Sequence, residues 1–149
     1  MELQACQRVA ASFDRIAEKL DETVEGFYRR LFERQPQVRP LFPADMARQR
    51  EHLGASLAIV ARNMIHLDIL REPLMLLGAQ HVVFGARPEH YPAVRDAMLD
   101  SIGASLGDAW TEQLRSDWLE ALNDVVALML RGAVTAAIDA AAIVPATEN

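Results

Sequence analysis

Cysteine is almost absent from this sequence, which has only Cys6 among its 149 residues. A single cysteine excludes an internal disulfide and any metal site built from several cysteines. We expect Cys6 to be an ordinary small residue on an exposed first helix. Basic side chains are outnumbered, because 15 Lys and Arg stand against 21 Asp and Glu and give a formal net charge of -6. A net acidic chain is poorly suited to nucleic acid or to an anionic membrane surface, so we expect neither as a partner.

Long apolar runs and a secretory signal are missing as well. No run approaches the roughly 18 apolar residues of a membrane-spanning helix. A secretory signal needs an uninterrupted apolar segment near the N-terminus. We therefore expect a cytoplasmic protein with no part in a membrane. The charged side chains that interrupt the first twenty residues include Arg8, Asp14, Arg15, Glu18 and Lys19.

The motifs of several common enzyme classes do not occur. There is no Gly-rich phosphate loop, no HExxH zinc motif, and no Ser or Cys placed between a strand signal and a helix signal. Alternation of apolar and polar residues with a period of two, the pattern of a half-buried strand, is also almost absent. These absences argue against the corresponding enzymes and leave a helical protein.

Apolar residues recur instead at steps of three and four, which places them on one face of a helix. Hydrophobic residues make up 51% of the chain, enough to bury a single core. We predict one all-α domain over residues 1–149 with about six to eight helices, in which residues 140–149 form a frayed tail. The apolar stripes span Val9–Leu20, Val24–Phe32, Met46–Leu67, Leu74–Phe84, Tyr91–Leu106 and Leu114–Met129.

The corner after the second helix is the clearest break in the first half of the chain. Asp21 can cap the second helix at its start. The segment 35–43, QPQVRPLFP, has three prolines, which end that helix and turn the chain sharply. We expect this corner to leave Leu41 and Phe42 directed inward.

Boundaries in the second half follow from prolines, glycines and one cap. The third helix is predicted to run unbroken from about Asp45 to Leu67. Pro73 is expected in the first turn of the fourth helix, and Gly85 should end that helix. Pro88 then starts the fifth helix, and Thr111 caps the sixth.

Three polar residues sit on stripes that should be apolar, namely Tyr28, Gln49 and His81. They belong to three different predicted helices, so together they indicate a polar-lined cavity in the core. His81 alone has two interpretations: a core histidine whose ring nitrogens are hydrogen-bonded, or a metal ligand. The other histidines, at 52, 66 and 90, have polar neighbours and are expected at the surface.

Five segments together resemble bacterial single-domain haemoglobins and the haem domain of flavohaemoglobins. The similarity runs from Phe27 to Val126, and its most specific part is His81 followed ten residues later by Tyr91 across a GxxPxxY turn. The segments are FYRRLF at 27–32, QVRPLFP at 37–43, the helix with Gln49 and Leu53, HVVFGARPEHYPAV at 81–94, and GDAWTEQLRSDW at 107–118.

The resemblance implies a globin fold with haem b, iron protoporphyrin IX, as cofactor. It assigns His81 as the ligand of the iron and Phe42 as a residue that packs on the porphyrin. Tyr28 and Gln49 would hydrogen-bond iron-bound dioxygen, and Leu53 would lie beside that ligand. A neutral imidazole is a good iron ligand, and donors aimed at bound dioxygen stabilise its partial negative charge.

Three further positions qualify the resemblance. Tyr91 matches a tyrosine near the proximal histidine. His52, one turn along from Gln49, is a rival distal residue, because the segment between Phe42 and Gln49 is shorter than in many relatives. The glutamate that flavohaemoglobins place beside the proximal histidine corresponds to Ala133, so His81 is expected to lack an anionic partner.

The leading functional hypothesis is a haem protein that binds dioxygen reversibly, for storage or carriage. With an external reductase it would also detoxify nitric oxide, and nitric oxide dioxygenase activity is expected only with that reductase in trans, because no reductase domain follows residue 149. The alternative is a haem-based sensor of diatomic gases that acts through a separate partner. A third possibility is a haem-free helical interaction module.

Overall fold

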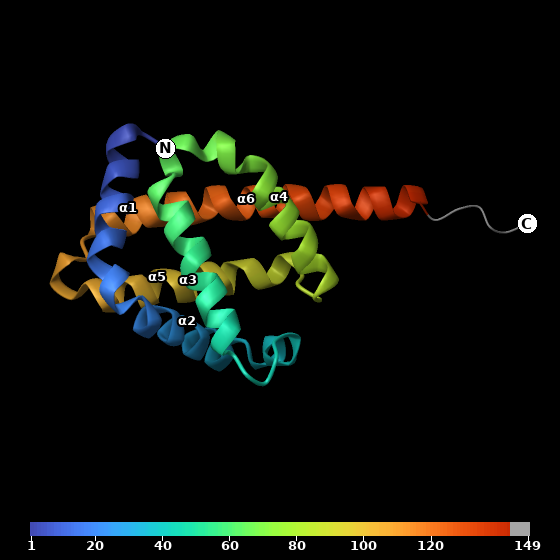
Figure 1. Cartoon of the computed structure of the whole chain (residues 1–149), viewed down its shortest axis with the longest axis horizontal. Coiled ribbons are helices and arrows are strands. Elements are labelled where there is room, and N and C mark those ends of the chain that lie inside the picture. The colour runs from blue at the N-terminus through green and yellow to red at the C-terminus, as the bar shows by residue number, and fades with distance from the viewer. Residues whose placement is uncertain (144–149) are drawn as a thin grey trace, which may run out of the picture.

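A computed structural model describes the backbone of residues 1–143 and the side chains of residues 1–139, and no strand occurs in that part of the chain (Figure 1). The predicted all-α fold is confirmed, with six α-helices joined by short 3-10 turns. The helices are α1 (Leu3–Ile16), α2 (Leu20–Arg34), α3 (Ala47–Arg62), α4 (Leu67–Val83), α5 (Tyr91–Leu106) and α6 (Glu112–Ile143). The turns are η1 (Ala17–Lys19), η2 (Pro36–Leu41), η3 (Met64–His66), η4 (Pro88–His90) and η5 (Gly107–Ala109).

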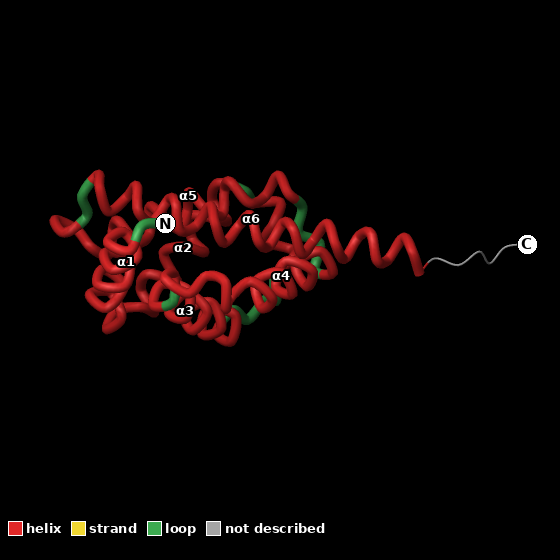
Figure 2. Tube along the Cα trace, turned by 90° about the horizontal axis from the view of Figure 1, so that it is seen from above, coloured by secondary structure: helices red, strands yellow, loops and turns green. Residues whose placement is uncertain are grey.

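The helices pack as two neighbouring pairs with two crossing helices. Helix α2 lies beside α5, and α4 lies beside α6. Helices α1 and α3 run across the direction of α5 and α6 (Figure 1), and Figure 2 shows α3 and α4 along one side of the molecule. This arrangement places α2 and α3 together on one side of the interior and the end of α4 on another.

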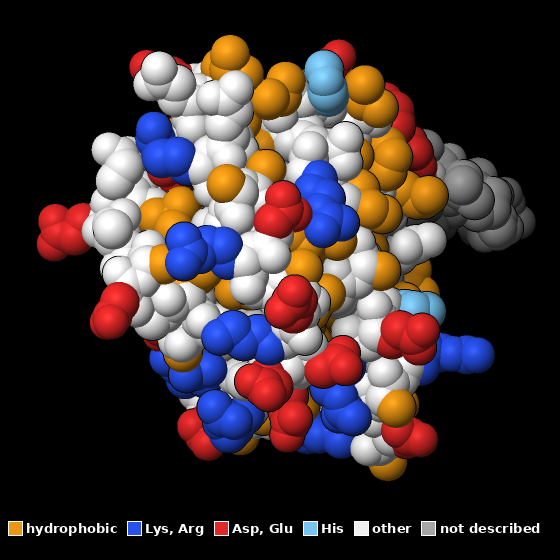
Figure 3. Space-filling model, turned by 60° about the vertical axis from the view of Figure 1, so that its left-hand side comes forward, with side chains coloured by type: hydrophobic (Ala, Val, Ile, Leu, Met, Phe, Trp, Pro, Cys, Tyr) orange, Lys and Arg blue, Asp and Glu red, His pale blue; other side chains and the backbone are white. Residues whose placement is uncertain are grey.

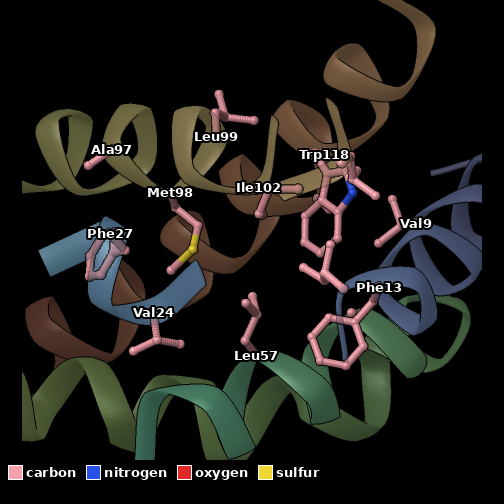
Figure 4. Close-up of a cluster of buried hydrophobic side chains, with 14 of the residues drawn as sticks. Val9, Phe13, Val24, Phe27, Leu57, Ala97, Met98, Leu99, Ile102 and Trp118 are labelled. Carbon is pink, nitrogen blue, oxygen red and sulfur yellow. The ribbon is translucent and has the colours of Figure 1, made fainter. Parts of the chain in front are cut away.

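The core lies where α1, α2, α3, α5 and α6 meet (Figure 4). Trp118 is fully buried, and its indole N–H donates a hydrogen bond to Ser12 Oγ at 2.8 Å. Ser12 in turn donates to the carbonyl of Val9 at 2.8 Å. A buried indole needs such a partner for its N–H group, so this short chain of bonds lets the largest core side chain stay in the interior.

The backbones of α4 and α6 are in direct contact. A Cβ added at Gly78 would lie 1.9 Å from the carbonyl oxygen of Met129, and one added at Gly132 would lie 1.8 Å from that of Met75. Real Cβ atoms do not come so close to backbone oxygens, so only glycine fits at these two positions. The two glycines therefore fix how α4 is seated on α6.

Three predicted helix boundaries, those of α2, α3 and α4, are wrong. The third helix does not run unbroken to Leu67, because α3 ends at Arg62, where the side-chain amide of Asn63 donates to the Ile59 carbonyl at 2.7 Å. Since α4 begins at Leu67, Pro73 lies inside that helix and not in its first turn. Helix α2 begins one residue before Asp21, so Asp21 does not cap it.

The cap of α6 and the glycine after α4 are as predicted, whereas Pro88 starts the 3-10 turn η4 and α5 begins only at Tyr91. The hydroxyl of Thr111 accepts a hydrogen bond from the Leu114 amide at 3.1 Å, which is the expected cap of α6. Gly85 follows the end of α4 with a φ of 98°. Helix α6 continues to Ile143, four residues into the segment predicted as a frayed tail, and the rest of that segment lies outside the described residues.

Cys6 is buried, with 4% of its surface exposed, so its expected place on an exposed helix face is wrong. Helix α1 packs against α3, α5 and α6, and this covers the face that carries the thiol.

The segment Glu112–Asp139 of α6 is long and apolar enough to cross a membrane, as judged by length and composition. The expectation that nothing in the chain resembles a span therefore holds only for uninterrupted apolar runs. Core helices of soluble proteins share these properties, and α6 packs against α1, α4 and α5.

Candidate functional site

Tyr28 and Gln49 come together at the contact between α2 and α3. Tyr28 is 6% exposed, and its hydroxyl accepts a hydrogen bond from the Gln49 side-chain amide at 3.1 Å. This bond uses a lone pair of the tyrosine oxygen and leaves the O–H proton available to a second acceptor. The predicted polar pair in the interior is thus assembled from two helices that are separate in sequence.

Burial keeps Tyr28 in its protonated form. Loss of water contact raises the pKa of the Tyr28 hydroxyl above its ordinary value, while the Gln49 bond and the nearby Arg50 charge act in the opposite direction. Burial has the largest effect because it disfavours the phenolate charge. Tyr28 therefore remains a hydrogen-bond donor at every physiological pH.

An aromatic cluster fixes the ring of Tyr28. Its centroid lies 4.8 Å from that of Phe27, 5.7 Å from that of Phe32 and 5.6 Å from that of Phe42. Phe32 and Phe42 also meet each other at 5.3 Å, in an edge-to-face arrangement. Such pairs are rigid and apolar, so they orient the tyrosine hydroxyl while excluding competing polar partners.

Arg39 holds the corner that carries Phe42, and the sequence analysis missed this residue. Its guanidinium donates to the carbonyls of Phe42, Pro43 and Ala44 at 3.0 to 3.3 Å. The same group lies 5.0 Å above the ring of Phe32. The only sequence signal was its position between two prolines, where few backbone amides can stabilise the turn.

Helix α3 orients Gln49 and Leu53 toward the interior and His52 toward solvent. Gln49 and Leu53 are half-buried, and Leu53 packs against the core, whereas His52 is exposed. His52 and Leu53 both lie about one turn beyond Gln49, and it is the exposure of His52 that separates the two. The geometry therefore favours Gln49 over His52 as the partner of Tyr28.

His81 lies near the end of α4 and is half-buried. Its Nδ1 atom is 2.8 Å from the carbonyl oxygen of Leu77, one turn earlier. The bond forms when the proton is on Nδ1, and Nε2 then presents a lone pair suited to a metal. The turn after the helix closes on the same residue, because the Ala86 amide donates to the His81 carbonyl at 2.9 Å.

The surroundings of His81 are apolar and exposed. Val83 and Phe84 are 82% and 70% exposed, so Phe84 does not continue the buried stripe as predicted. The reason is that α4 ends at Val83, and the next residue leaves the helical register. Leu41, predicted to point inward, is 37% exposed and touches Gly85, where an added Cβ would lie 2.9 Å from its Cδ2.

The hydrogen-bond partner of the His81 ring is a neutral group, because Nδ1 meets a backbone carbonyl. Position 133 on α6, which the resemblance matches to a glutamate, carries alanine and so has no carboxylate. Tyr91 is buried at the first residue of α5, and burial raises the pKa of its hydroxyl. The turn after α4 and the 3-10 turn η4 separate Tyr91 from the end of the helix that carries His81.

The chemistry of these donors tests whether haem fits. No group of three His, Cys, Asp or Glu side chains that could hold a metal occurs in the part of the chain that the structure describes. An iron bound by His81 must therefore take most of its ligands from an organic cofactor, as haem iron does. A flat apolar macrocycle would also cover side chains such as Val83 and Phe84, so the residues present fit this group.

Comparison with known families gives an independent result. The sequence model of the globin family matches residues 25–129 of this chain. A flavohemoprotein of Xylella fastidiosa is 32% identical over 132 residues, which cover 80% of this chain and 32% of that protein. One from Rhizobium meliloti is 28% identical over 109 residues, which cover 71% and 27%. The chain thus spans about a third of the length of these flavohemoproteins.

Solved structures give the same fold. An engineered carbene transferase, a candidate nitric oxide dioxygenase from Rhodothermus marinus, superposes with a TM-score of 0.82 at 28% identity and covers 97% of this chain and 99% of its own. A bacterial globin from Campylobacter jejuni superposes with a TM-score of 0.81 at 20% identity, covering 90% and 97%. A flavohemoglobin of Malassezia yamatoensis with bound FAD and heme has a TM-score of 0.74 at 19% identity, over 91% of this chain and 37% of its own.

Proposed function

Because this chain belongs to the globin family, we propose that it binds haem b through His81 and holds dioxygen, or another diatomic gas, between Tyr28, Gln49 and Leu53. The observation that carries this proposal is the pairing of two features. His81 has its Nδ1 atom engaged by the Leu77 carbonyl, and Tyr28 has a lone pair engaged by Gln49. Each residue thus keeps free the group that this function requires.

Haem, when bound, would supply an iron able to take up a diatomic gas. The residues of this chain decide how firmly the gas is held. Dioxygen on ferrous haem carries partial negative charge, so the O–H group of Tyr28 can donate a charge-assisted hydrogen bond to it. Such bonds contribute about 1.5–3 kcal/mol.

Gln49 has the role of orienting Tyr28. By donating to the tyrosine oxygen at 3.1 Å, it restricts the direction of the remaining O–H bond. The cluster of Phe27, Phe32 and Phe42 limits water near that bond, which strengthens it by lowering the local dielectric. Phe42 would also face the porphyrin edge, and Leu53 would limit the space beside the gas.

We further propose that the dioxygen-loaded protein consumes nitric oxide and then needs an electron from a separate reductase. The solved structure from Rhodothermus marinus, a candidate nitric oxide dioxygenase, supports the link to this chemistry, and the flavohemoprotein relatives, about three times as long as this chain, support the need for a further protein. Reversible dioxygen binding needs no such partner. A reductase should therefore change the rate of nitric oxide consumption but should have no effect on reversible dioxygen binding.

A spectrum of the reconstituted ferrous protein tests the cofactor assignment. We expect an intense Soret band and the features of an open axial position. The absence of a Soret band after incubation with haem would leave a haem-free helical module as the function.

Nitric oxide loss in a sealed electrode chamber tests the reaction. The dioxygen-loaded protein with NADH alone should give one rapid burst and then stall, and adding a reductase should restore turnover. Continuous consumption with NADH alone would contradict the need for a reductase. If no burst occurs, the nitric oxide proposal is wrong, and dioxygen storage or gas sensing is the better description.

A further inference from the structure

A pocket lies between α2 and α5, on a different face of α2 from Tyr28. Its volume is about 300 Å³, and none of its lining residues belongs to the candidate gas site. Charged side chains crowd the lower part of the face shown in Figure 3, at the level where α2 runs in Figure 1. The pocket is therefore separate from the proposed haem site, and what it binds does not depend on that proposal.

The lining of this pocket is positively charged, in contrast to the acidic chain as a whole. Lys19, Arg29 and Arg30 line it, against the single carboxylate of Glu22. None of the three cations takes part in an ion pair formed within the described part of the chain. One turn further along, Arg34 is neutralised by Asp100 at 2.6 Å.

The two arginines converge over Gly26. A Cβ added to this glycine would lie 2.9 Å from Arg30 Nη1, 3.7 Å from Arg29 Nη2 and 3.9 Å from Ser101 Oγ. Arg30 is held in place because the same Nη1 donates to the Gly26 carbonyl at 3.2 Å and to Ser101 Oγ at 3.1 Å. Two guanidinium groups this close repel each other unless an anion lies between them.

Hydroxyl groups complete the pocket. Ser101 is buried and accepts its bond from Arg30, so its own O–H proton can be donated into the pocket. Thr23 donates to the Lys19 carbonyl at 3.2 Å and therefore accepts its 2.6 Å bond from Ser105, so these two hydroxyls are engaged within the fold and Ser101 is the hydroxyl donor left for a ligand. Guanidinium N–H groups and hydroxyls are hydrogen-bond donors, and a ligand rich in acceptor oxygens matches them.

We propose that this pocket binds the phosphate group of a small metabolite, either a phosphate ester or a diphosphate. Three cations and one carboxylate leave an excess of two positive charges, which suits a dianion better than a single carboxylate. The volume of about 300 Å³ is at the lower limit of small-molecule sites, so the ligand is small. A net charge of -6 over the whole chain disfavours a nucleic acid or an anionic bilayer as the source of the phosphate.

Calorimetric titration of the full chain with pyrophosphate tests this proposal. At constant ionic strength we expect saturable binding to one site, with succinate binding much more weakly. Arg29→Gln removes an exposed guanidinium that forms no hydrogen bond or ion pair among the described residues, and it should weaken binding about tenfold or more. Gly26→Ala places a methyl group among the donors without changing charge, and it should also weaken binding strongly.

Arg115→Gln is the matched control, because Arg115 is an exposed arginine on α6 outside the pocket. It removes the same charge and should leave the dissociation constant nearly unchanged. Three results would each overturn the proposal: no saturable binding of pyrophosphate at millimolar concentration, equal weakening by Arg29→Gln and Arg115→Gln, or succinate binding as tight as that of pyrophosphate. Far-ultraviolet circular dichroism and urea unfolding confirm that each variant is folded before it is titrated.

Discussion

Tyr28 and His81, which face the two sides of the proposed gas site, are held in place by different means. Tyr28 is 6% exposed, is bonded to a residue of another helix and is surrounded by three phenylalanines. His81 is half-buried, and its side-chain hydrogen bond is to the Leu77 carbonyl of its own helix, near the exposed Val83 and Phe84. The distal side is thus fixed by side chains, whereas the proximal side depends on how α4 is seated on α6.

This contrast has a physical consequence. Side-chain networks lose function locally, because each donor or ring can be removed without moving a helix. Backbone packing fails collectively, because one added methyl group displaces a whole helix. Substitutions on the two sides should therefore differ in what they damage, and the predictions below are arranged from the largest expected effect to the smallest.

The largest effect is expected for His81→Gly. If His81 is the only protein ligand of the iron, the variant should retain haem poorly, and added imidazole should restore the Soret band by occupying the vacated position. Haem transfer to an acceptor globin measures the loss. His52→Gly, a histidine on α3 that points to solvent, is the control and should retain haem normally. Equal haem loss in both variants would reject the assignment of His81.

The next effect is expected for Gly78→Ala, which tests the backbone contact behind the proximal side. The new Cβ would need space now occupied by the Met129 carbonyl, 1.9 Å away, so α4 must move off α6. We expect a loss of about 3 kcal/mol in the free energy of unfolding, at the upper end for overpacking. Urea unfolding measures it.

Gly54→Ala is the matched control for that change. Gly54 is also a buried helical glycine, but its added Cβ would meet the flexible end of Leu20 at 3.1 Å. Alanine gains about 1 kcal/mol of helix propensity there, so the variant should be nearly neutral. If both substitutions destabilise alike, the α4–α6 contact is not special.

Tyr28→Phe should change the gas site without changing the fold. Loss of one charge-assisted bond of about 1.5–3 kcal/mol predicts roughly 10–100-fold faster dissociation of dioxygen. Carbon monoxide accepts hydrogen bonds poorly, so its dissociation should change much less. Stopped-flow measurements on both gases separate the two cases. Tyr91→Phe is the control and should leave both dissociation rates nearly unchanged. Equal acceleration of both gases in Tyr28→Phe would indicate a steric effect in place of a lost hydrogen bond.

The smallest effect concerns the start of α6, the helix on which α4 is seated. Bonds from the Arg8 guanidinium at 2.6 and 3.0 Å, with a smaller contribution from Gln113, lower the pKa of the buried Asp117 carboxyl despite its burial. A lowered folded-state pKa stabilises the fold above the unfolded value of about 3.9 and loses that stabilisation as pH falls through the folded value. Stability should therefore decline on acidification below about pH 4.

Urea midpoints at neutral and acidic pH, for the wild type and Asp117→Asn, measure this contribution. The variant should be the less stable at pH 7, and the difference should shrink in acid. A difference that does not depend on pH would mean that the Asp117 charge is irrelevant and that only its shape matters.

Periodicity predicted the helices that are buried along one clear stripe. The stripes that end in Leu106 and Met129 lie where expected, because α5 and α6 bury these faces in the core. The break after Arg62 was missed, since neither proline nor glycine marks it and Asn63 ends the helix through a local bond. Pro73 was wrongly placed in the first turn of its helix, because proline is rare inside helices. It is tolerated inside α4 because the carbonyl left without an N–H donor is that of Ile69, a residue that is 68% exposed and can be hydrated.

The candidate site was predictable to the extent that it rests on polar residues in apolar stripes. Tyr28 and Gln49 stood out from the pattern, and the structure joins them. Arg39 did not, because a charged residue in a corner looks like any surface residue until its three carbonyl partners are known. The exposure of Phe84 was also beyond a pattern argument, since it depends on where the helix ends.

The glycine contact between α4 and α6 also limits how this protein can vary. Gly78 lies three residues before His81, Gly132 lies immediately before Ala133, and each glycine makes room for a backbone carbonyl of the facing helix. Sliding α4 by one residue would place a side chain against the Met129 carbonyl, so the register of the two helices is locked. The exposed Val82, Val83 and Phe84, beyond the lock, could be redesigned for new gas selectivity or new partners while His81 keeps its place, whereas Gly85, with its φ of 98°, could not. Any substitution of these two interlocking glycines, Gly78 and Gly132, should destabilise the fold, although neither residue lines the proposed gas site.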